Sequence, residues 1–416
     1  MATLVDTDRS ESKSASAFTA LRNPDFRIFW IGACLSFIGS WVQIVAMGWL
    51  VYHITGSKEA LGIIGLAGGI PTTVLMLFGG VIADRANKRL LVMTTQTIFG
   101  LTAFALAALT WTGRIALWHI AVLSFINGAV FAADGPARQA MIVSIVGRED
   151  LAGGVALQSA AFNLARVIGP AVGGLLYAAV GPAWCFFING VSFGAIILAV
   201  ALVRTDLSAQ AEPQNSVWIG LMEGLRYLRS NRLMKAVVSL TAVTSVFAFS
   251  AYSTLMPAIG RDTLHLSEDR YGWLFSAVGL GSLVGVYLVG QHAAAGRRGR
   301  LMFSGALIFA AALFGLTLTR NFSAALVLLF VVGLAAISQL TTANTLTQSL
   351  APDRLQGRAV SVHMFAMAGL QPLGAYLAGL LAQRWGVAAT LQIDAGILLL
   401  YALFLLALRP EVARLE

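Results

Sequence analysis

Long apolar segments account for most of this sequence of 416 residues. About 20 apolar residues are enough for a helix to cross a bilayer, and these segments reach that length. Lipid offers no partners to backbone N–H and C=O groups, so a spanning segment must satisfy them internally as a helix. The expected spans are 26–53, 60–83, 90–111, 116–141, 152–179, 184–203, 234–258, 270–290, 301–319, 322–346, 358–382 and 388–408. The sequence therefore predicts an all-α membrane protein with twelve transmembrane helices.

The composition argues against an ordinary soluble domain. Only 11% of the residues are charged and 58% are hydrophobic, whereas a soluble domain carries about 25% charged residues. The first 25 residues are polar, and the apolar run after them is too long for the core of a signal peptide. We therefore expect residues 1–25 to form a cytoplasmic tail before a first helix that is retained.

Basic residues are distributed unevenly between the two sides of this topology. With the N-terminus inside, 21 of the 28 Lys and Arg residues fall in inner segments and 6 in outer loops. Because positive charge favours the cytoplasmic side, both termini are predicted to be cytoplasmic, with the chain in the inner (cytoplasmic) membrane. The same distribution accounts for the net charge of +9 without a nucleic-acid partner.

The longest polar break divides the chain into two halves. It covers residues 204–233 and separates 26–203 from 234–408, and 409–416 form a second cytoplasmic tail. Within the break, residues 217–228 have the pattern of an amphipathic helix at the membrane interface. A plain solvated linker explains the same polarity equally well.

The two halves also resemble each other. The fifth span opens with Arg148 to Leu151 and the eleventh with Asp353 to Leu355, roughly 200 residues later. Both spans start on the same side of the membrane, so the repeat is parallel, as in halves related by an axis along the membrane normal. The sequence thus predicts two six-helix bundles.

The loop between the second and third spans combines one carboxylate with several basic residues and a glycine. Its candidate residues are Gly80, Asp84, Arg85, Lys88 and Arg89. Anchoring by positive charge explains the basic pair, but not Asp84 beside it. A carboxylate here can accept hydrogen bonds from a helix N-terminus and pair with an arginine, so the loop is interpreted as a conformational switch. The segment resembles the signature loop of the major facilitator superfamily, with Asn87 at a position usually held by Gly; Asn tolerates a left-handed turn.

The fifth span carries small residues at regular spacing around a Gly-Pro pair. They are Gly169, Pro170, Gly173 and Gly174, preceded by Ala156 and Ala165. Small residues let helices approach closely, and the pattern is similar to the antiporter motif of facilitator-type exporters, with Ala in place of two glycines. The resemblance implies a tight seam that prevents proton leakage in the outward-closed state; generic helix packing is the alternative.

The stretch from Gly135 to Gly174 is similar to the subgroup of this superfamily that contains the enterobactin exporter and the macrolide efflux proteins. The resemblance implies two bundles around a central cavity that opens alternately to either side. It also implies export of a drug-like compound or siderophore, driven by inward proton flow. We expect the protein to act as a monomer. An importer of a small nutrient and, less readily, a non-transporting membrane receptor are the alternatives.

Charges inside the membrane are expensive and therefore mark candidate functional positions. Asp134 and Arg138 stand four residues apart on one helix face. They are predicted to form a structural pair at the inner rim that braces the Asp84 loop near Arg358. Arg166 is expected to face the bundle interior, where it binds an anionic group or pairs with a carboxylate.

Asp394 is the candidate proton carrier, because no basic residue lies within one turn of it on its own span. A carboxyl whose surroundings alternate between wet and dry exchanges a proton as they change. Against this role, Asp394 lies within about two turns of the outer surface, where water can reach it.

Uncharged polar and aromatic residues complete the candidates for the transport path. Gln43, Asn163, Gln339 and Asn344 are candidate polar contacts, although each such residue alone is more often an interhelical hydrogen bond. Candidates for an adaptable apolar pocket are Trp30, Phe37, Trp41, Trp49, Phe247, Phe249, Tyr252, Met364 and Met367.

Motifs of enzymes and metal proteins are lacking in this sequence. It contains no Walker-type glycine loop, no metal-ligand spacing, and five scattered His residues. We therefore expect no catalytic activity, no metal and no cofactor.

The predicted topology is tested with reporter tags. Tags at the N-terminus, near Gln210 and at the C-terminus should report cytoplasm, and a tag near Asp262 should report the outside, because basic residues are concentrated on one side. An outside signal at Gln210 would contradict the twelve-span arrangement.

Overall fold

A computed structural model describes residues 17–147, 149–208, 217–292 and 298–415. Side chains are described throughout these ranges except at 17–18, 77–84, 217–221, 223, 225 and 292. Within this part of the chain, twelve helical segments are long and apolar enough to cross a membrane, which confirms the predicted all-α fold.

The first half consists of six uninterrupted spans. They are α1 (Pro24–Thr55), α2 (Lys58–Arg85), α3 (Lys88–Trp111), α4 (Leu117–Val146), α5 (Leu151–Val180) and α6 (Pro182–Leu202). A short helix, η1 (Ala17–Arg22), precedes them, and α7 (Val217–Ser230) follows them.

Two spans of the second half are broken into shorter helices. The seventh is α8 (Arg232–Val243), η2 (Thr244–Phe249), α9 (Ser250–Ala258) and η3 (Ile259–Thr263); the eleventh is η5 (Asp353–Leu355), α13 (Gln356–Met364), η6 (Phe365–Gly369) and α14 (Gln371–Trp385). The others are α10 (Glu268–His292), α11 (Arg298–Leu316), α12 (Phe322–Ser349) and α15 (Val387–Leu408), before a final turn, η7 (Val412–Arg414).

Asparagine and glycine mark several helix ends. Asn23 accepts hydrogen bonds from the N–H groups of Asp25 and Phe26 at the start of α1, as expected of an N-cap. Gly181 and Gly386 have φ values of 85° and 86°, a conformation that only glycine adopts readily. Gly181 joins the fifth span to the sixth, and Gly386 joins the eleventh to the twelfth. The two halves therefore use the same kind of glycine turn at equivalent positions.

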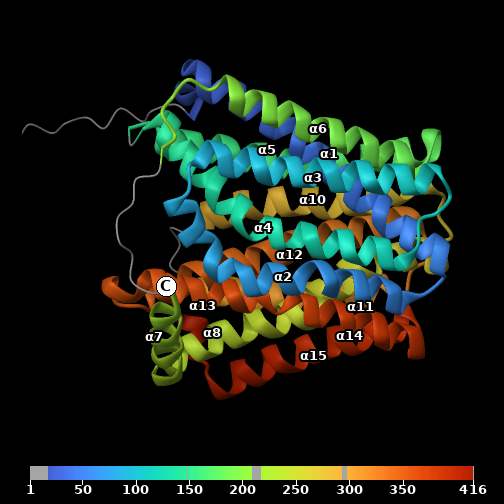
Figure 1. Ribbon diagram of the computed structural model, residues 1–416. Helices are drawn as coiled ribbons and strands as arrows, with labels where there is room; N and C mark the ends of the chain where they lie inside the picture. Colours follow the sequence, from blue (N-terminus) through green and yellow to red (C-terminus); the bar gives the residue numbers. More distant parts are fainter. Residues whose placement is uncertain (1–16, 148, 209–216, 293–297, 416) are drawn as a thin grey trace, which may run out of the picture.

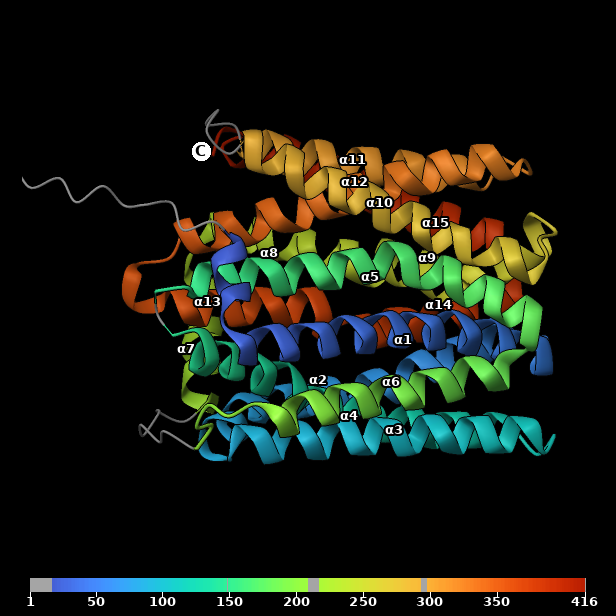
Figure 2. The same cartoon turned by 90° about the horizontal axis from the view of Figure 1, so that it is seen from above.

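The helices run between two faces of the molecule (Figure 1). The terminal face carries η1, α7, η7 and the turn between α2 and α3. The far face carries the turn between α1 and α2 and the turn between α14 and α15. Figure 2 shows the helices of the first half, from blue to green, mostly on one side of the molecule and those of the second half mostly on the other.

The two halves repeat the same packing, which confirms two six-helix bundles. The second span packs on the fourth (α2 on α4, α10 on α12), and the third packs on the sixth (α3 on α6, α11 on α15). Large apolar side chains such as Leu198 and Leu400 are 61% and 68% exposed, as expected of a surface that faces lipid. Contact between the halves comes mainly from α2 against α14 and α5 against α10.

The polar break between the halves contains a helix. α7 packs against α13, and the Tyr227 hydroxyl donates to the Leu350 carbonyl over 2.8 Å. Leu228 packs with Met234 and Val238 of α8. These contacts dock α7 on the second half, and its position at a membrane interface stays a prediction.

Three π-helical segments interrupt the broken spans, and the sequence interpretation did not foresee them. They are η2, η3 and η6. The Ser245 hydroxyl in η2 donates to the Met367 carbonyl in η6, and the Ser250 hydroxyl donates to the Gln371 carbonyl over 3.0 Å. π-Helical turns are frequent at functional sites, and here they place two irregular segments side by side at mid-span.

Candidate functional site

A cavity of about 360 Å³ lies between the two halves. Its walls come from α1 and α2, from α5, and from the seventh and eighth spans of the second half. Trp41, Phe249, Tyr252, Tyr271 and Phe275 give it an aromatic lining. The first three were expected to line a pocket; the other six aromatic and Met candidates do not line this one. A concave, mostly apolar site between halves with a few polar groups is the usual form of a small-molecule pocket.

Arg166 is the one charged residue in the described lining of this cavity. It is half-buried on α5. Tyr271, which also lines the cavity, packs against Trp49 with ring centroids 4.7 Å apart and the rings tilted by 43°. Its buried hydroxyl has no hydrogen-bond partner in the described part of the chain. A buried hydroxyl without a partner costs stability, so Tyr271 offers an unused hydrogen-bonding group to a ligand.

The glycine motif of α5 creates two close helix contacts. A Cβ on Gly169 would lie 2.5 Å from Cβ of Trp41 on α1, and one on Gly173 would lie 3.0 Å from Cα of Val42. A Cβ on Gly174 would lie 3.0 Å from the carbonyl oxygen of Glu268 on α10. The motif therefore packs α5 on its own half and on the opposite half.

The α5–α10 seam continues beside the cavity. A Cβ on Gly272 would lie 2.1 Å from the Pro170 carbonyl oxygen, and one on Gly279 would lie 2.7 Å from the Arg166 carbonyl oxygen. Glycine on α10 thus meets the motif backbone of α5 directly, and any larger residue forces the halves apart. The backbone of Arg166 is fixed in the same seam.

The α2–α14 seam is built in the same way. A Cβ on Gly62 would lie 2.8 Å from the Ala375 carbonyl oxygen, and one on Gly379 would lie 2.7 Å from the Lys58 carbonyl oxygen. With the α5–α10 seam, it closes the space between the halves toward the far face.

Polar side chains join the halves at the rim of the far face. Lys58 Nζ lies 2.9 Å from Asp262 Oδ2, which also accepts a hydrogen bond of 2.6 Å from the Tyr52 hydroxyl. The Lys58 N–H donates to Gln383 Oε1 over 2.9 Å. We call Tyr52, Lys58, Asp262 and Gln383 the far-face latch. The latch was not predicted from the sequence. Its one signal in the sequence was that Lys58 and Asp262 carry opposite charges in two loops on the same side of the membrane.

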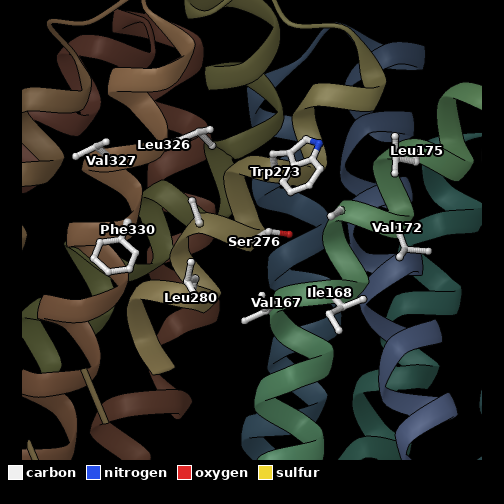
Figure 3. Close-up of a pocket in the computed structure, with 12 residues that line it drawn as sticks. Val167, Ile168, Val172, Leu175, Trp273, Ser276, Leu280, Leu326, Val327 and Phe330 are labelled. Carbon is white, nitrogen blue, oxygen red and sulfur yellow. The ribbon is translucent and has the colours of Figure 1, made fainter. Parts of the chain in front are cut away.

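A second hollow, of about 650 Å³, lies between α5, α10 and α12. Figure 3 shows Val167 and Ile168 of α5 facing Trp273 and Ser276 of α10 across it. Its lining contains no charged residue. Both hollows have an apolar lining and a buried hydroxyl without a partner, Tyr271 in the first and Ser276 in the second. The cavity with Arg166 is the stronger candidate site, because its lining also contains a charge.

Asp134 and Arg138 form a buried network inside the first half. Arg138 Nε lies 2.9 Å from Asp134 Oδ2, and Asp134 Oδ1 accepts hydrogen bonds of 2.6 Å from both Thr95 and Gln96. Arg138 also donates to Ser36 over 3.3 Å. The pair was predicted at the inner rim, but α4 continues to Val146, so Arg138 lies about two turns inside the end of this helix. Each charge therefore has partners on α1 or α3.

The described residues of the α2–α3 turn brace the first half. Lys88 Nζ donates to Ser144 of α4 over 2.8 Å. Arg89 donates to the carbonyls of Val203 and Thr205 after α6, the latter over 3.2 Å. Arg85 is exposed.

The predicted switch is only partly described. The surroundings of Gly80 and the side chain of Asp84 lie outside the described residues, so the pairing of Asp84 with Arg138 or Arg358 stays a prediction. Arg358 lies on α13 beside Gly224 of α7. Asn87 is not left-handed as suggested; it has φ −61° and caps α3 by accepting from the Leu90 N–H.

The uncharged polar candidates lie away from the described cavity lining. Gln43 accepts a hydrogen bond from Asn189 over 2.8 Å, and Asn163 donates to the Ser159 carbonyl in its own helix. Gln339 donates to Thr244 over 2.6 Å. Gln339 Oε1 and Asn344 Oδ1 are buried without a partner in the described part of the chain.

Asp394 is buried on α15, at 2% exposed. It faces the core with Leu391 and Leu398. Within the described ranges it has neither a hydrogen-bond partner nor an ion-pair partner, and it does not line the cavity that contains Arg166. The structure therefore does not pair Asp394 with Arg166.

Residues 15–415 match the model of a family described as transmembrane secretion effectors. The chain is 28% identical over 362 residues to the multidrug efflux pump Tap of Mycolicibacterium fortuitum, covering 85% of this chain and 88% of the relative. It is 28% identical over 391 residues to the enterobactin exporter EntS of Shigella boydii serotype 18, covering 93% and 92%.

Solved structures share the fold at low sequence identity. The nucleoside transporter NupG superposes with a TM-score of 0.79 at 11% identity, covering 92% of this chain and 98% of that one. A bacterial homologue of the human lysosomal transporter Spinster, in an inward-facing conformation, gives 0.70 at 13% identity, covering 94% and 96%. These neighbours agree with the two-bundle architecture.

Removing the latch charge should loosen the far face. A partly exposed ion pair contributes about 1 kcal/mol or less. We therefore expect Asp262→Asn to raise the ratio of open to closed far-face states by roughly fivefold. The measurement is labelling of Thr254→Cys in the cavity by a membrane-impermeant thiol reagent, in a chain whose Cys34 and Cys185 are Ala.

The matched control is Asp269→Asn on the same face, whose carboxylate bonds the neighbouring Ser267. Labelling should stay at the wild-type rate in this control. Equal labelling of the Asp262→Asn and unsubstituted chains would show that the latch does not contribute to closure.

Proposed function

Because the chain belongs to the transmembrane secretion effector family of the major facilitator superfamily, we propose that it exports small molecules by alternating access. Family membership makes it a multi-pass membrane transporter and not an enzyme. The relatives Tap and EntS are named a multidrug efflux pump and an enterobactin exporter. Their names support outward transport of a drug-like compound or siderophore.

We propose that the protein lies in the inner membrane with its terminal face toward the cytoplasm. The support is the excess of basic residues in the predicted inner segments, 21 of 28, together with the preference of positive charge for the cytoplasmic side. Arg226, Arg229 and Arg300 are exposed there. The far face is then the outside.

The closed far face is the observation that carries the proposal. The latch and the far-face ends of both seams, at Gly174 and Gly379, join the halves at this face. In the proposed orientation, a substrate reaches the cavity from the cytoplasm, which is the loading step of an exporter. Release requires the same contacts to separate while the terminal face closes.

The cavity chemistry favours amphipathic aromatic substrates with an anionic group. The aromatic lining offers stacking surfaces, which add to simple burial. Arg166 supplies a charge that is never lost and a planar set of donors suited to carboxylate, phosphate or an anionic phenol. Tyr271 adds one hydrogen-bonding group.

Proton antiport is the proposed energy source. Asp134 is held by Arg138, Thr95 and Gln96, so it suits a structural role. Asp394 is buried and unpaired in the described part of the chain, so it is the proposed carrier. A carboxyl exchanges a proton when its surroundings change between dry and wet.

Arg166 should set selectivity by charge. We expect Arg166→Gln to raise the KM for an anionic catecholate siderophore by about 10-fold or more, since a charge-assisted hydrogen bond contributes about 1.5–3 kcal/mol. The KM for a neutral macrolide should change little. Uptake into energised inverted membrane vesicles measures both.

Arg320→Gln, on the exposed far-face turn, is the matched control and should leave both KM values unchanged. An equal rise for the anionic and neutral substrates with Arg166→Gln would mean that Arg166 serves the structure and not recognition. Uptake by right-side-out vesicles instead of inverted ones would indicate an importer.

Asp394→Asn should uncouple transport. We expect this chain to lose substrate accumulation against a gradient while keeping substrate exchange, because the amide cannot carry a proton. The measurement is accumulation in energised inverted vesicles with and without a protonophore, with Glu411→Gln as the control. A protonophore-sensitive gradient built by Asp394→Asn would move the coupling to Asp134 or to another ion.

A further inference from the structure

A separate groove of about 710 Å³ opens at the terminal face of the second half. It lies between α8, the α13–η6 segment and α15, which run together in the lower part of Figure 1. Further toward the far face, α15 packs against α14. The groove therefore occupies the terminal half of the gap between the eleventh and twelfth spans, with α8 as its floor.

The walls of this groove are apolar and reach the lipid-facing surface. Phe365 of η6 stands on one side, and Phe404 and Leu408 of α15 stand on the other. Phe404 and Leu408 are 54% and 57% exposed. Apolar walls open to the bilayer are shaped for an acyl chain, and Leu228 of α7 contributes to the lining as well.

Basic residues surround the mouth of the groove. Arg232 and Lys235 lie three residues apart on α8, one turn from each other. Both are exposed, and neither forms an ion pair within the described residues. Arg409 at the end of α15 lies 3.7 Å from Glu411, and these two side chains are 38% and 50% exposed. A pair so open to water neutralises Arg409 weakly, so the mouth stays positive.

We propose that this groove binds an anionic phospholipid from the leaflet at the terminal face. The acyl chains lie against Phe365, Phe404 and Leu408, and the phosphate lies at Arg232, Lys235 and Arg409. Basic pockets between transmembrane helices attract anionic headgroups, and the apolar walls add a requirement for the chains. Because α7 and the eleventh span both border the groove, the lipid joins the linker to the second half.

The test compares two lipids with the same acyl chains on the full-length protein in detergent. Native mass spectrometry should show several-fold more bound phosphatidylglycerol than phosphatidylcholine. In Arg232→Gln combined with Lys235→Gln, phosphatidylglycerol binding should fall on the order of 10-fold, toward the level of phosphatidylcholine.

The matched control is Arg298→Gln combined with Arg300→Gln, which removes two charges at the terminal end of α11 outside the groove. It should bind phosphatidylglycerol as the wild type does. Equal binding of the two lipids by the wild-type protein would overturn the proposal. A loss of phosphatidylglycerol binding in the control double variant as large as that in the groove double variant would overturn it as well.

A groove-filling variant separates the lipid from a free anion. Ala242→Phe occupies the floor of the groove and keeps the basic mouth, so it should lower phosphatidylglycerol binding as well. Unchanged binding in this variant, with displacement by inorganic phosphate, would indicate a plain anion site and would contradict a lipid.

Discussion

Close backbone contact between the halves, at α5 with α10 and at α2 with α14, is the constraint on which the rest of the structure depends. Gly272 and Gly279 admit the carbonyls of Pro170 and Arg166, and Gly62 admits the carbonyl of Ala375. Backbones packed this closely have few intermediate arrangements, because protein interiors are dense and even one added methyl group disturbs the packing. The seams thus determine where Arg166 stands, how wide the aromatic cavity is, and whether Lys58 reaches Asp262. They also explain why glycine in α5 faces two partners: Gly169 and Gly173 fix α5 to α1, so that α5 moves with its own half, while Gly174 meets α10.

The latch and the seams differ in strength and in what they respond to. Lys58 and Asp262 have side chains 20% and 36% exposed, and an ion pair in such a setting contributes about 1 kcal/mol or less. The seams gain from many dispersion contacts, each small and together large. We infer that the seams supply most of the closure energy and that the latch mainly aligns the first and second spans with the seventh and eleventh. A substrate that favours far-face opening must offset mainly the seam contacts.

The twelve spans could be predicted from the sequence because apolar length is a local property that lipid makes decisive. Gly169, Gly173 and Gly174 could likewise be assigned to close packing from their spacing. The positions of buried charges along their helices, and their hydrogen-bond partners, were less predictable. Asp134 and Arg138 were recognised as a pair from their spacing. Their location depends on the length of α4, and their partners Thr95 and Ser36 lie on other helices. The latch joins residues more than 200 positions apart, and no local pattern reports such a contact. Two of the π-helical segments are joined by a hydrogen bond between spans, from the Ser245 hydroxyl to the Met367 carbonyl, and this contact likewise leaves no local pattern.

These irregular segments offer a connection between Asp394, the proposed proton carrier, and Arg166, the proposed substrate contact, although the two residues do not touch. α15, which carries Asp394, packs against η2, and η2 contributes Phe249 to the cavity lining. η2 is in turn bonded to η6 in the eleventh span, directly before the α14 residues that meet α2 in the seam. A π-helical turn interrupts the regular hydrogen-bond ladder of the α-helix around it, and such turns are frequent at functional sites. A change of charge on α15 therefore has a short mechanical route through η2 to the cavity and through η6 to the far-face seam. The first half has no counterpart among its described residues: its buried charges Asp134 and Arg138 pair with each other, and its spans are uninterrupted α-helices. The first half then acts as the rigid partner, and the second half contains the segments that yield.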